Sequence, residues 1–257
     1  MERLRIYWGR VTAMRIPLYA SHAGFFMILA AFPTLVLLLS LFRYTGLEVS
    51  VLTDLISGLI PKAFLPGAKQ LILSAYRSTT GTLVSISAIT ALWSAGKGFY
   101  GLRAGLNAVY GVGETRSWLQ LRLISMGYTV AFLLVLISSL LLHLSGAVML
   151  SLLPFWENLI RLRFFLLLGL QAVLFAAMFT ILPNTAVRFR DTLPGAFLAA
   201  LAWQIFSNLY SFYAEHFAGL SGIYGSVYGV ALSMLWVYFC VSILFYAAAL
   251  NRWLAKE

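Results

Sequence analysis

Charged residues are scarce in this chain of 257 residues. Asp, Glu, Lys and Arg together make up 10% of it, hydrophobic residues make up 61%, and the mean hydropathy is +0.90. Soluble domains contain about 25% charged and about 45–50% apolar residues. The composition therefore excludes a soluble domain and indicates an integral membrane protein.

Cysteine and alternating sequence patterns are also nearly absent. Cys240 is the single cysteine, so the chain forms no intrachain disulfide, and cysteine usage indicates no compartment. A membrane β-barrel needs apolar and polar residues in alternation, whereas the long apolar runs here are continuous over about 20 residues, the length of a membrane-crossing helix. The predicted fold class is all-α.

Recognisable catalytic and metal-binding patterns are lacking. The three histidines, His22, His143 and His216, form no ligand-spaced pair. Asp54 and Asp191 fall on opposite sides of the membrane in the topology derived below. The chain has no nucleophile elbow, no P-loop and no paired carboxylates on a common helix face. We expect no catalytic residue, no metal and no cofactor.

Six long apolar stretches predict a polytopic bundle of six transmembrane helices. They cover about residues 24–42, 82–100, 123–153, 164–182, 192–213 and 225–250, with a bend at Pro33 in the first. A polar link is expected at 102–122, and short turns are expected at 154–163 and 217–224. Residues 21–257 form one transmembrane domain in this interpretation.

Two further regions are expected to lie on the membrane surface. The basic segment 1–20 carries four arginines among apolar residues, a mixture typical of an interfacial helix on an anionic surface. Residues of about 47–78 show helical spacing of leucine and isoleucine and predict two amphipathic outer helices, broken at Pro61 and at Pro66-Gly67.

The distribution of positive charge predicts the topology. Six spans place both termini on one side, and twelve of the 18 Lys and Arg residues fall on that side. Since cytoplasmic loops carry the excess of Lys and Arg, both termini are expected in the cytoplasm. The basic residues lie between apolar runs rather than on one groove-binding face, so no nucleic-acid partner is expected.

Polar side chains recur at helical spacing in two of the spans. One stripe consists of Gln204, Asn208, Ser211 and Glu215, and the other of Ser87, Thr90, Ser94 and Lys97. An unpartnered amide in hydrocarbon costs roughly 4 kcal/mol or more on alkane scales, so neither stripe should face lipid tails. The stripes either join helices through side-chain bonds or line a polar furrow for a lipid head group or small solute.

A polar link and a stripe of small residues are the other candidate sites. In the link, Asn107, Tyr110, Glu114 and Arg116 either bind a head group and gate a cytoplasmic path or, the favoured interpretation, form a turn locked by Glu114 and Arg116 with Asn107 capping backbone groups. Gly225, Gly229 and Ser233 are four apart and predict a helix-packing surface.

Short motifs along the chain resemble the YihY/virulence factor BrkB family from about residue 20 to 254. They are Ala31-Phe32-Pro33, Leu106–Arg116 (LNAVYGVGETR), Pro183-Asn184, Pro194-Gly195-Ala196, Trp203-Gln204, Ile223-Tyr224-Gly225-Ser226 and Leu250-Asn251. One departure is notable: the family commonly has Gly-Ala-Glu before the closing Leu-Asn, where this chain has Ala247, Ala248 and Ala249. If a shared activity required that acid, this chain would lack it.

The resemblance implies a bacterial-type inner-membrane protein with six helices and no settled biochemical role. Family members have also been labelled ribonuclease BN, but the residues described above do not support an enzyme. The leading hypothesis is a transporter or flippase-like mover of a lipid or small polar solute, with membrane lipids and a homo-oligomer as partners. The alternative is a non-catalytic scaffolding membrane protein, and a ribonuclease is the least favoured hypothesis.

Overall fold

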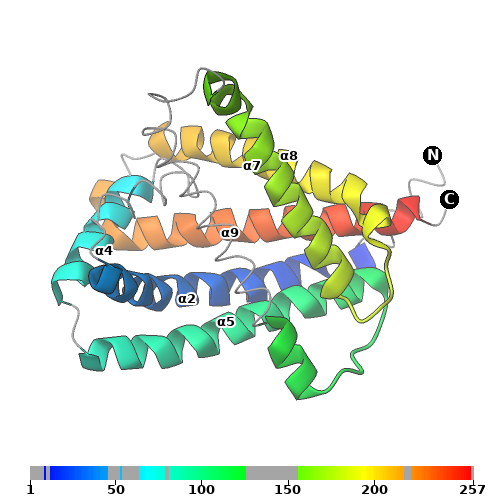
Figure 1. Cartoon of the computed structure of the whole chain (residues 1–257), viewed down its shortest axis with the longest axis horizontal. Coiled ribbons are helices and arrows are strands. Elements are labelled where there is room, and N and C mark those ends of the chain that lie inside the picture. The colour runs from blue at the N-terminus through cyan, green and yellow to red at the C-terminus, as the bar shows by residue number, and fades with distance from the viewer. Residues whose placement is uncertain are drawn as a thin grey trace. The chain divides into compact units, whose positions relative to one another are not determined.

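A computed structural model describes residues 9, 12–45, 53, 64–78, 81–125, 156–216 and 221–255. Its long helices are α2 (Ile16–Thr45), α4 (Leu65–Ser78), α5 (Gly81–Tyr110), α7 (Trp156–Ile181), α8 (Phe189–His216) and α9 (Ser221–Leu254) (Figure 1). These ranges contain no strand. The all-α class is therefore confirmed for the described part of the chain.

One described segment, Tyr228–Leu254 of α9, is long and apolar enough to cross a membrane by length and composition. Its mean hydropathy is 2.1, and shorter apolar helical segments occur at Ile16–Ala31 and Leu167–Ile181. The number of six spans stays a prediction. The first outer helix apart from residue 53, and nearly all of the third span, from residue 126 onward, lie outside the described residues.

Several helix boundaries differ from the prediction. Helix α5 continues to Tyr110, although a polar link was expected from residue 102, because Leu102, Leu106 and Val109 extend its buried face at helical spacing. Helix α7 already begins at Trp156, directly after Pro154, and α9 begins at Ser221, so the turns expected through residues 163 and 224 were predicted too long.

The helix expected from about residue 123 begins at residue 118. A capping box explains this start: the Ser117 N–H donates to Gln120 Oε1 at 3.0 Å, and the Gln120 N–H donates to Ser117 Oγ at 3.4 Å. The two bonds satisfy backbone donors that the first turn of a helix leaves free.

The predicted surface helices also differ from the structure in two respects. Pro66-Gly67 does not break α4 but lies in its first turn, where proline is tolerated because its missing N–H has no intrahelical acceptor. Helix α2 begins at Ile16, after Arg15 with a φ of 50°, so the basic segment ends before residue 20. Residues 1–8, 10 and 11 of that segment lie outside the described ranges.

The described chain divides into two compact units. The first consists of Met1–Gly105 and Trp203–Ile243, and the second of Leu106–Ala202 and Leu244–Glu257. In the first unit, contacts run in the order α5, α2, α9 and the second part of α8, as Figure 1 also shows. Helix α4 packs against α2 in the same unit.

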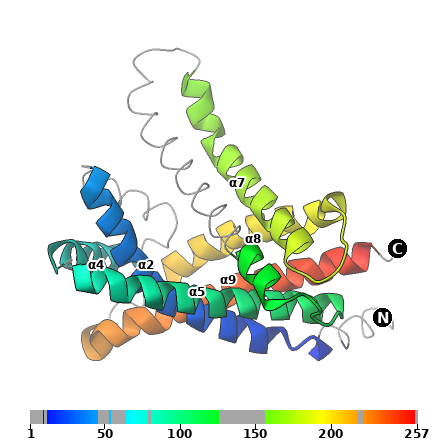
Figure 2. The ribbon, with the colours of Figure 1, turned by 60° about the horizontal axis from the view of Figure 1, so that its bottom comes forward.

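Glycines allow the close contacts of α2. A Cβ on Gly101 of α5 would lie 2.9 Å from the Cα of Ala23, and one on Gly24 would lie 3.5 Å from the backbone N of Tyr238 in α9. Because small residues let helix backbones approach closely, they set the spacing of this row. Pro33 lies inside α2, and Figure 2 shows the helix changing direction in its second half, as a proline kink would produce.

Aromatic side chains and two hydrogen bonds join α8 to α9 in the first unit. The rings of Trp203 and Trp236 have centroids 5.8 Å apart. The Trp236 Nε1–H donates to Ser207 Oγ at 3.2 Å, and the Tyr210 hydroxyl donates to the Leu232 carbonyl at 2.8 Å. The face of α8 that contacts α9 is therefore built from residues 203, 207 and 210.

In the second unit, α7, the first part of α8 and the end of α9 meet at buried polar groups. Thr192 of α8 is fully buried and lies 3.3 Å, between hydroxyl oxygens, from Thr180 of α7. Asn251 of α9 donates from Nδ2 to the Thr192 carbonyl at 3.1 Å. These bonds hold the three helix segments together.

Candidate functional site

The predicted stripe of α5 does not form one continuous polar surface. Ser87 and Ser94 are buried, 5% and 0% exposed, on the same face as Gly98, which packs against α2. Thr90 donates its hydroxyl to the Ile86 carbonyl of its own helix at 2.9 Å, and Lys97 is exposed. This face therefore serves mainly as a packing surface of small residues.

Ser94 is the exception within that packing surface. Its Oγ is buried and has no hydrogen-bond partner among the described residues. Lys97 lies one turn from the exposed Trp93, so its stem lies on an apolar surface while its ammonium group can extend to water.

The predicted stripe of α8 lies mostly on the outside of the first unit. Asn208 and Glu215 are exposed, Gln204 is half-buried, and Ser211 is 9% exposed. Asn208 Nδ2 donates to the Gln204 carbonyl at 2.9 Å, and Ser211 Oγ donates to Glu215 Oε1 at 3.1 Å. These bonds stay within the helix, so they do not hold α8 to a neighbour.

Three different faces follow one another around this part of α8. At about 100° per residue, the polar stripe is centred roughly a third of a turn away from the face that contacts α9. A further rotation of similar size around the helix axis leads from the polar stripe to a third face. This face consists of the apolar residues Ile205, Leu209 and Phe212, which are 53%, 64% and 61% exposed. The polar stripe is therefore bordered by a surface suited to lipid tails.

The contacts of the described residues do not bring the two stripes together. Helices α2 and α9 lie between α5 and the second part of α8 in the row of the first unit (Figure 1). Direct facing of the stripes, which the two-sided furrow requires, thus has no support in these contacts. The exposed stripe of α8 is the part that could meet a solute.

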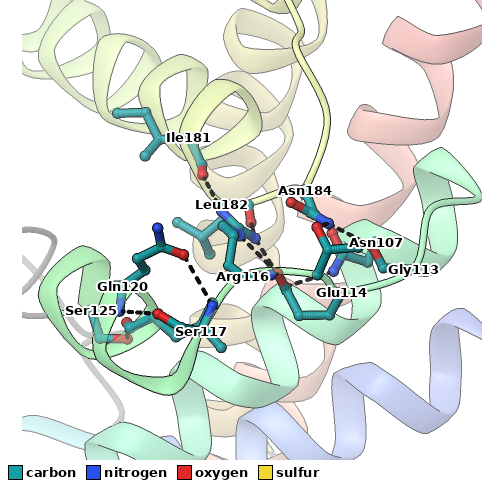
Figure 3. A network of polar contacts seen from close by, with 12 residues as sticks. Asn107, Gly113, Glu114, Arg116, Ser117, Gln120, Ser125, Ile181, Leu182 and Asn184 are labelled. Atoms are coloured by element: carbon teal, nitrogen blue, oxygen red, sulfur yellow. Dashed lines mark hydrogen bonds and ion pairs between the residues drawn. The ribbon is translucent and has the colours of Figure 1, made fainter.

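The best-defined polar cluster lies in the second unit, in the predicted link (Figure 3). Arg116 Nε donates to Glu114 Oε1 at 2.8 Å, and Arg116 Nη2 donates to Glu114 Oε2 at 3.0 Å. This two-bond fork is the geometry that guanidinium and carboxylate groups favour. The side chains of Arg116 and Glu114 are 17% and 23% exposed.

Arg116 also binds the end of α7. Its Nη1 donates to the Ile181 carbonyl at 3.1 Å and its Nη2 to the Leu182 carbonyl at 2.6 Å. The last carbonyls of a helix lack intrahelical donors and carry the negative end of the helix dipole, so a cation is favourable there. Arg116 thereby connects the link to α7.

Asn107 and Asn184 complete this cluster. Asn107 Nδ2 donates to Glu114 Oε2 at 3.0 Å, while its Oδ1 accepts from the Asn184 backbone N–H at 2.8 Å. Asn184 Nδ2 donates to the Gly113 carbonyl at 2.7 Å and to Thr115 Oγ1 at 2.8 Å. We call Asn107, Glu114, Arg116 and Asn184 the link clasp.

The link clasp contains the contacts that the favoured interpretation of the link expects, namely the Glu114–Arg116 pair and a backbone bond of Asn107. Its side-chain groups bond mainly to one another and to the backbone, so a ligand would have to displace existing bonds. The fourth residue, Asn184, was missed as a site residue, and the Pro183-Asn184 motif was the signal that could have indicated it.

The link clasp predicts a dependence of stability on acid pH. Hydrogen bonds from the Arg116 side chain are the largest cause that lowers the pKa of Glu114 from its ordinary value of 4.5 to about 2. A lowered folded-state pKa gives stability that is present above the unfolded value and is lost as pH falls from 4.5 toward 2. The melting temperature of the purified protein should therefore fall over this range, and more steeply than that of Glu114→Gln. If the melting temperatures of the two proteins fell equally with pH, the pH dependence would not come from Glu114.

Tyr110 lies beside the link clasp but does not join it. Its hydroxyl is buried without a hydrogen-bond partner among the described residues, and burial raises its pKa to about 12. Arg252 of α9 donates to the Val109 carbonyl at the end of α5 and lies against Gly111, whose φ is +70°. Arg252 therefore caps α5 as Arg116 caps α7.

Asn251 is a second polar connector that was not predicted as a site residue. Pro194 has no N–H and interrupts the hydrogen bonds of α8, and the following Gly195 N–H donates to Asn251 Oδ1 at 2.7 Å. Nearby, Ala248 and Ala249 are 0% and 2% exposed. Ala249, at the position of the family's acid, is thus packed in the interior of its unit.

Two further expectations concern metal binding and the stripe of small residues. The described residues hold no group of three or more His, Cys, Asp or Glu side chains that could bind one metal ion. Gly225 and Gly229 lie in α9, where a Cβ on Gly229 would meet no atom within 4 Å. Ser233 Oγ donates to the Gly229 carbonyl at 2.8 Å. Among the described residues, nothing packs against the stripe at Gly229.

Comparisons with known proteins agree on one family. The family model described as virulence factor BrkB matches residues 7–257. The chain is similar to the ribonuclease-like protein YfkH of Bacillus subtilis, at 28% identity over 100% of this chain and 96% of that protein. It is also similar to a UPF0761 membrane protein of Tolumonas auensis, at 25% identity over 90% of this chain and 78% of that protein. No solved structure matches the chain.

Proposed function

We propose that this chain, which belongs to the virulence factor BrkB family of membrane proteins, moves a lipid or small polar solute across the bacterial inner membrane. The path would follow the polar stripe of α8, formed by Gln204, Asn208, Ser211 and Glu215. In this proposal the chain spans the membrane six times, with both termini in the cytoplasm.

The observation that carries the proposal is the exposure of Asn208 and Glu215 on an otherwise apolar outer surface of α8. In a bilayer, unpartnered polar side chains at the lipid surface are costly, so such a stripe is favourable where it meets water or head groups. The bordering Ile205, Leu209 and Phe212 suit acyl chains. An amphiphile could therefore place its head on the stripe and its tails beside it.

The sequence contains no nucleotide-binding motif and no feature that marks energy coupling. The proposed movement is therefore passive or coupled by another protein. The ribonuclease-like name of the Bacillus subtilis relative belongs to that protein. Among the described residues, no group of three or more His, Cys, Asp or Glu side chains could hold the metal ion of a metal-dependent nuclease.

Reconstitution into liposomes tests the proposal. The wild-type protein should accelerate the exchange of fluorescent lipids between leaflets, followed by quenching of the outer leaflet, or the release of an enclosed small solute. A Gln204→Leu/Asn208→Leu variant should lower that rate about tenfold, the effect of losing one or two hydrogen bonds to the head group. Leu209→Met, a substitution on the neighbouring apolar surface, is the matched control and should keep the rate.

Unchanged movement of labelled lipids and solutes on adding the wild-type protein would refute the transport proposal. The alternative, a scaffolding protein, is favoured by the open side of Gly229, because stripes of small residues commonly mediate helix association in membranes. A scaffold would lose its oligomer in Gly229→Leu, whereas its function would be insensitive to the Gln204→Leu/Asn208→Leu change.

A further inference from the structure

Two hydrogen bonds within α8 use donors of the polar stripe. Asn208 uses an Nδ2–H on the Gln204 carbonyl at 2.9 Å, and Ser211 uses its hydroxyl hydrogen on Glu215 Oε1 at 3.1 Å. One N–H of Asn208 and the hydroxyl hydrogen of Ser211 are thus used on acceptors of the same helix. Asn208 and Glu215 are exposed, so a head group can reach the Asn208 Oδ1 carbonyl and the Glu215 carboxylate as acceptors.

The charge of the stripe also favours a cationic ligand. Glu215 is the single Asp, Glu, Lys or Arg between residues 203 and 215, and it is exposed. A carboxylate attracts a cation and repels a phosphate, and the effect grows where lipid lowers the local dielectric constant. An ammonium group carries three donors and one positive charge, so it complements both the acceptors and the charge.

We propose that the stripe of α8 selects amphiphiles whose head group carries an ammonium group, such as a zwitterionic phosphoethanolamine lipid, over anionic phosphoglycerol lipids. This selectivity rests on the proposed function of the stripe as a path for solutes. Both lipid classes carry one phosphate, so the ammonium group is the feature that Glu215 distinguishes.

The test uses the whole protein in liposomes with two lipids that carry the same fluorescent acyl chain, one with a phosphoethanolamine and one with a phosphoglycerol head. Exposed ion pairs contribute about 0.2–1 kcal/mol, which corresponds to about a 1.4- to fivefold preference, so the wild-type protein should move the ethanolamine lipid faster by a factor in that range. Glu215→Gln should bring the ratio of the two rates to about one, and Glu215→Lys should reverse it. Tyr213→Phe, also exposed on α8, should leave the ratio unchanged.

The outcomes separate this inference from the proposed function. If the wild-type protein moves both lipids at equal rates, or Glu215→Gln keeps the wild-type ratio, the selectivity is refuted while transport stands. If the wild-type protein moves neither lipid nor an enclosed solute, the proposed function fails and the selectivity fails with it. Because the readout is a ratio within one preparation, partial loss of folded protein in a variant cancels.

Discussion

Replacing Gly195 by alanine is expected to destabilise the protein more than any other single-methyl addition in the second unit. The new Cβ would lie 2.6 Å from the Ala247 carbonyl oxygen and 2.6 Å from Asn251 Cγ, and separations below 3.0 Å force one side to move. The bond from the Gly195 N–H to Asn251 would be strained or lost. Overpacking together with a broken buried hydrogen bond should cost about 3–4 kcal/mol.

The measurement is the thermal unfolding of the purified protein in detergent, with the yield of monodisperse protein as a second readout. Gly169→Ala in α7 is the matched control, since a Cβ there meets no atom within 4 Å. Alanine in an open helix interior should stabilise by about 0.5–1 kcal/mol, so the two substitutions should have opposite signs. Equal melting temperatures for the two variants would show that α8 and α9 do not approach closely at Gly195.

Much of the helical architecture could be predicted from the sequence because long apolar helices have a simple compositional signature. The runs later found in α2, α5, α7, α8 and α9 were each recognised by length and apolarity. Their ends were predicted less well. In α5 the polar residues after residue 102 predict a link, whereas Leu106 and Val109 continue the buried helix face to Tyr110.

The partners of the polar residues were harder to predict than the residues themselves. The link motif with Asn107, Glu114 and Arg116 was recognised because its residues are close in sequence. Asn184 lies 77 positions beyond Asn107, and Asn251 lies 56 positions beyond Gly195, so only the folded chain shows that these residues bond. The small motifs Pro183-Asn184, Pro194-Gly195 and Leu250-Asn251 marked the positions without indicating the pairs.

The two stripes show why polar spacing alone does not define a path. Ser87 and Ser94 of α5 and Asn208 and Glu215 of α8 have the same helical periodicity, yet the first pair is buried and the second is exposed. The short hydroxyl side chains of Ser87 and Ser94 fit a surface of small residues, whereas Asn208 and Glu215 lie on the outer surface of α8. Helical spacing alone does not distinguish these two placements.

Replacing Arg116 by methionine is the second change with a large expected effect. Methionine keeps the length of the aliphatic stem but removes the fork to Glu114 and the bonds to the Ile181 and Leu182 carbonyls, the latter at 2.6 Å. Hydrogen bonds to charged groups contribute about 1.5–3 kcal/mol each and are not additive, so a loss of about 2–4 kcal/mol is expected. The free energy or temperature of unfolding in detergent measures it.

Two companion variants of Arg116→Met make the result specific to the geometry of the link clasp. Arg116→Lys should recover only a minority of the loss, because an ammonium group cannot reproduce the planar fork that binds both carboxylate oxygens. Arg122→Met, six residues further along the chain, removes the same charge outside the link clasp and should change stability by less than about 0.5 kcal/mol. If the substitutions at residues 116 and 122 lowered stability equally, the effect would come from net charge. The bonds of Arg116 to the end of α7 and to Glu114 would then contribute little to the free energy of unfolding.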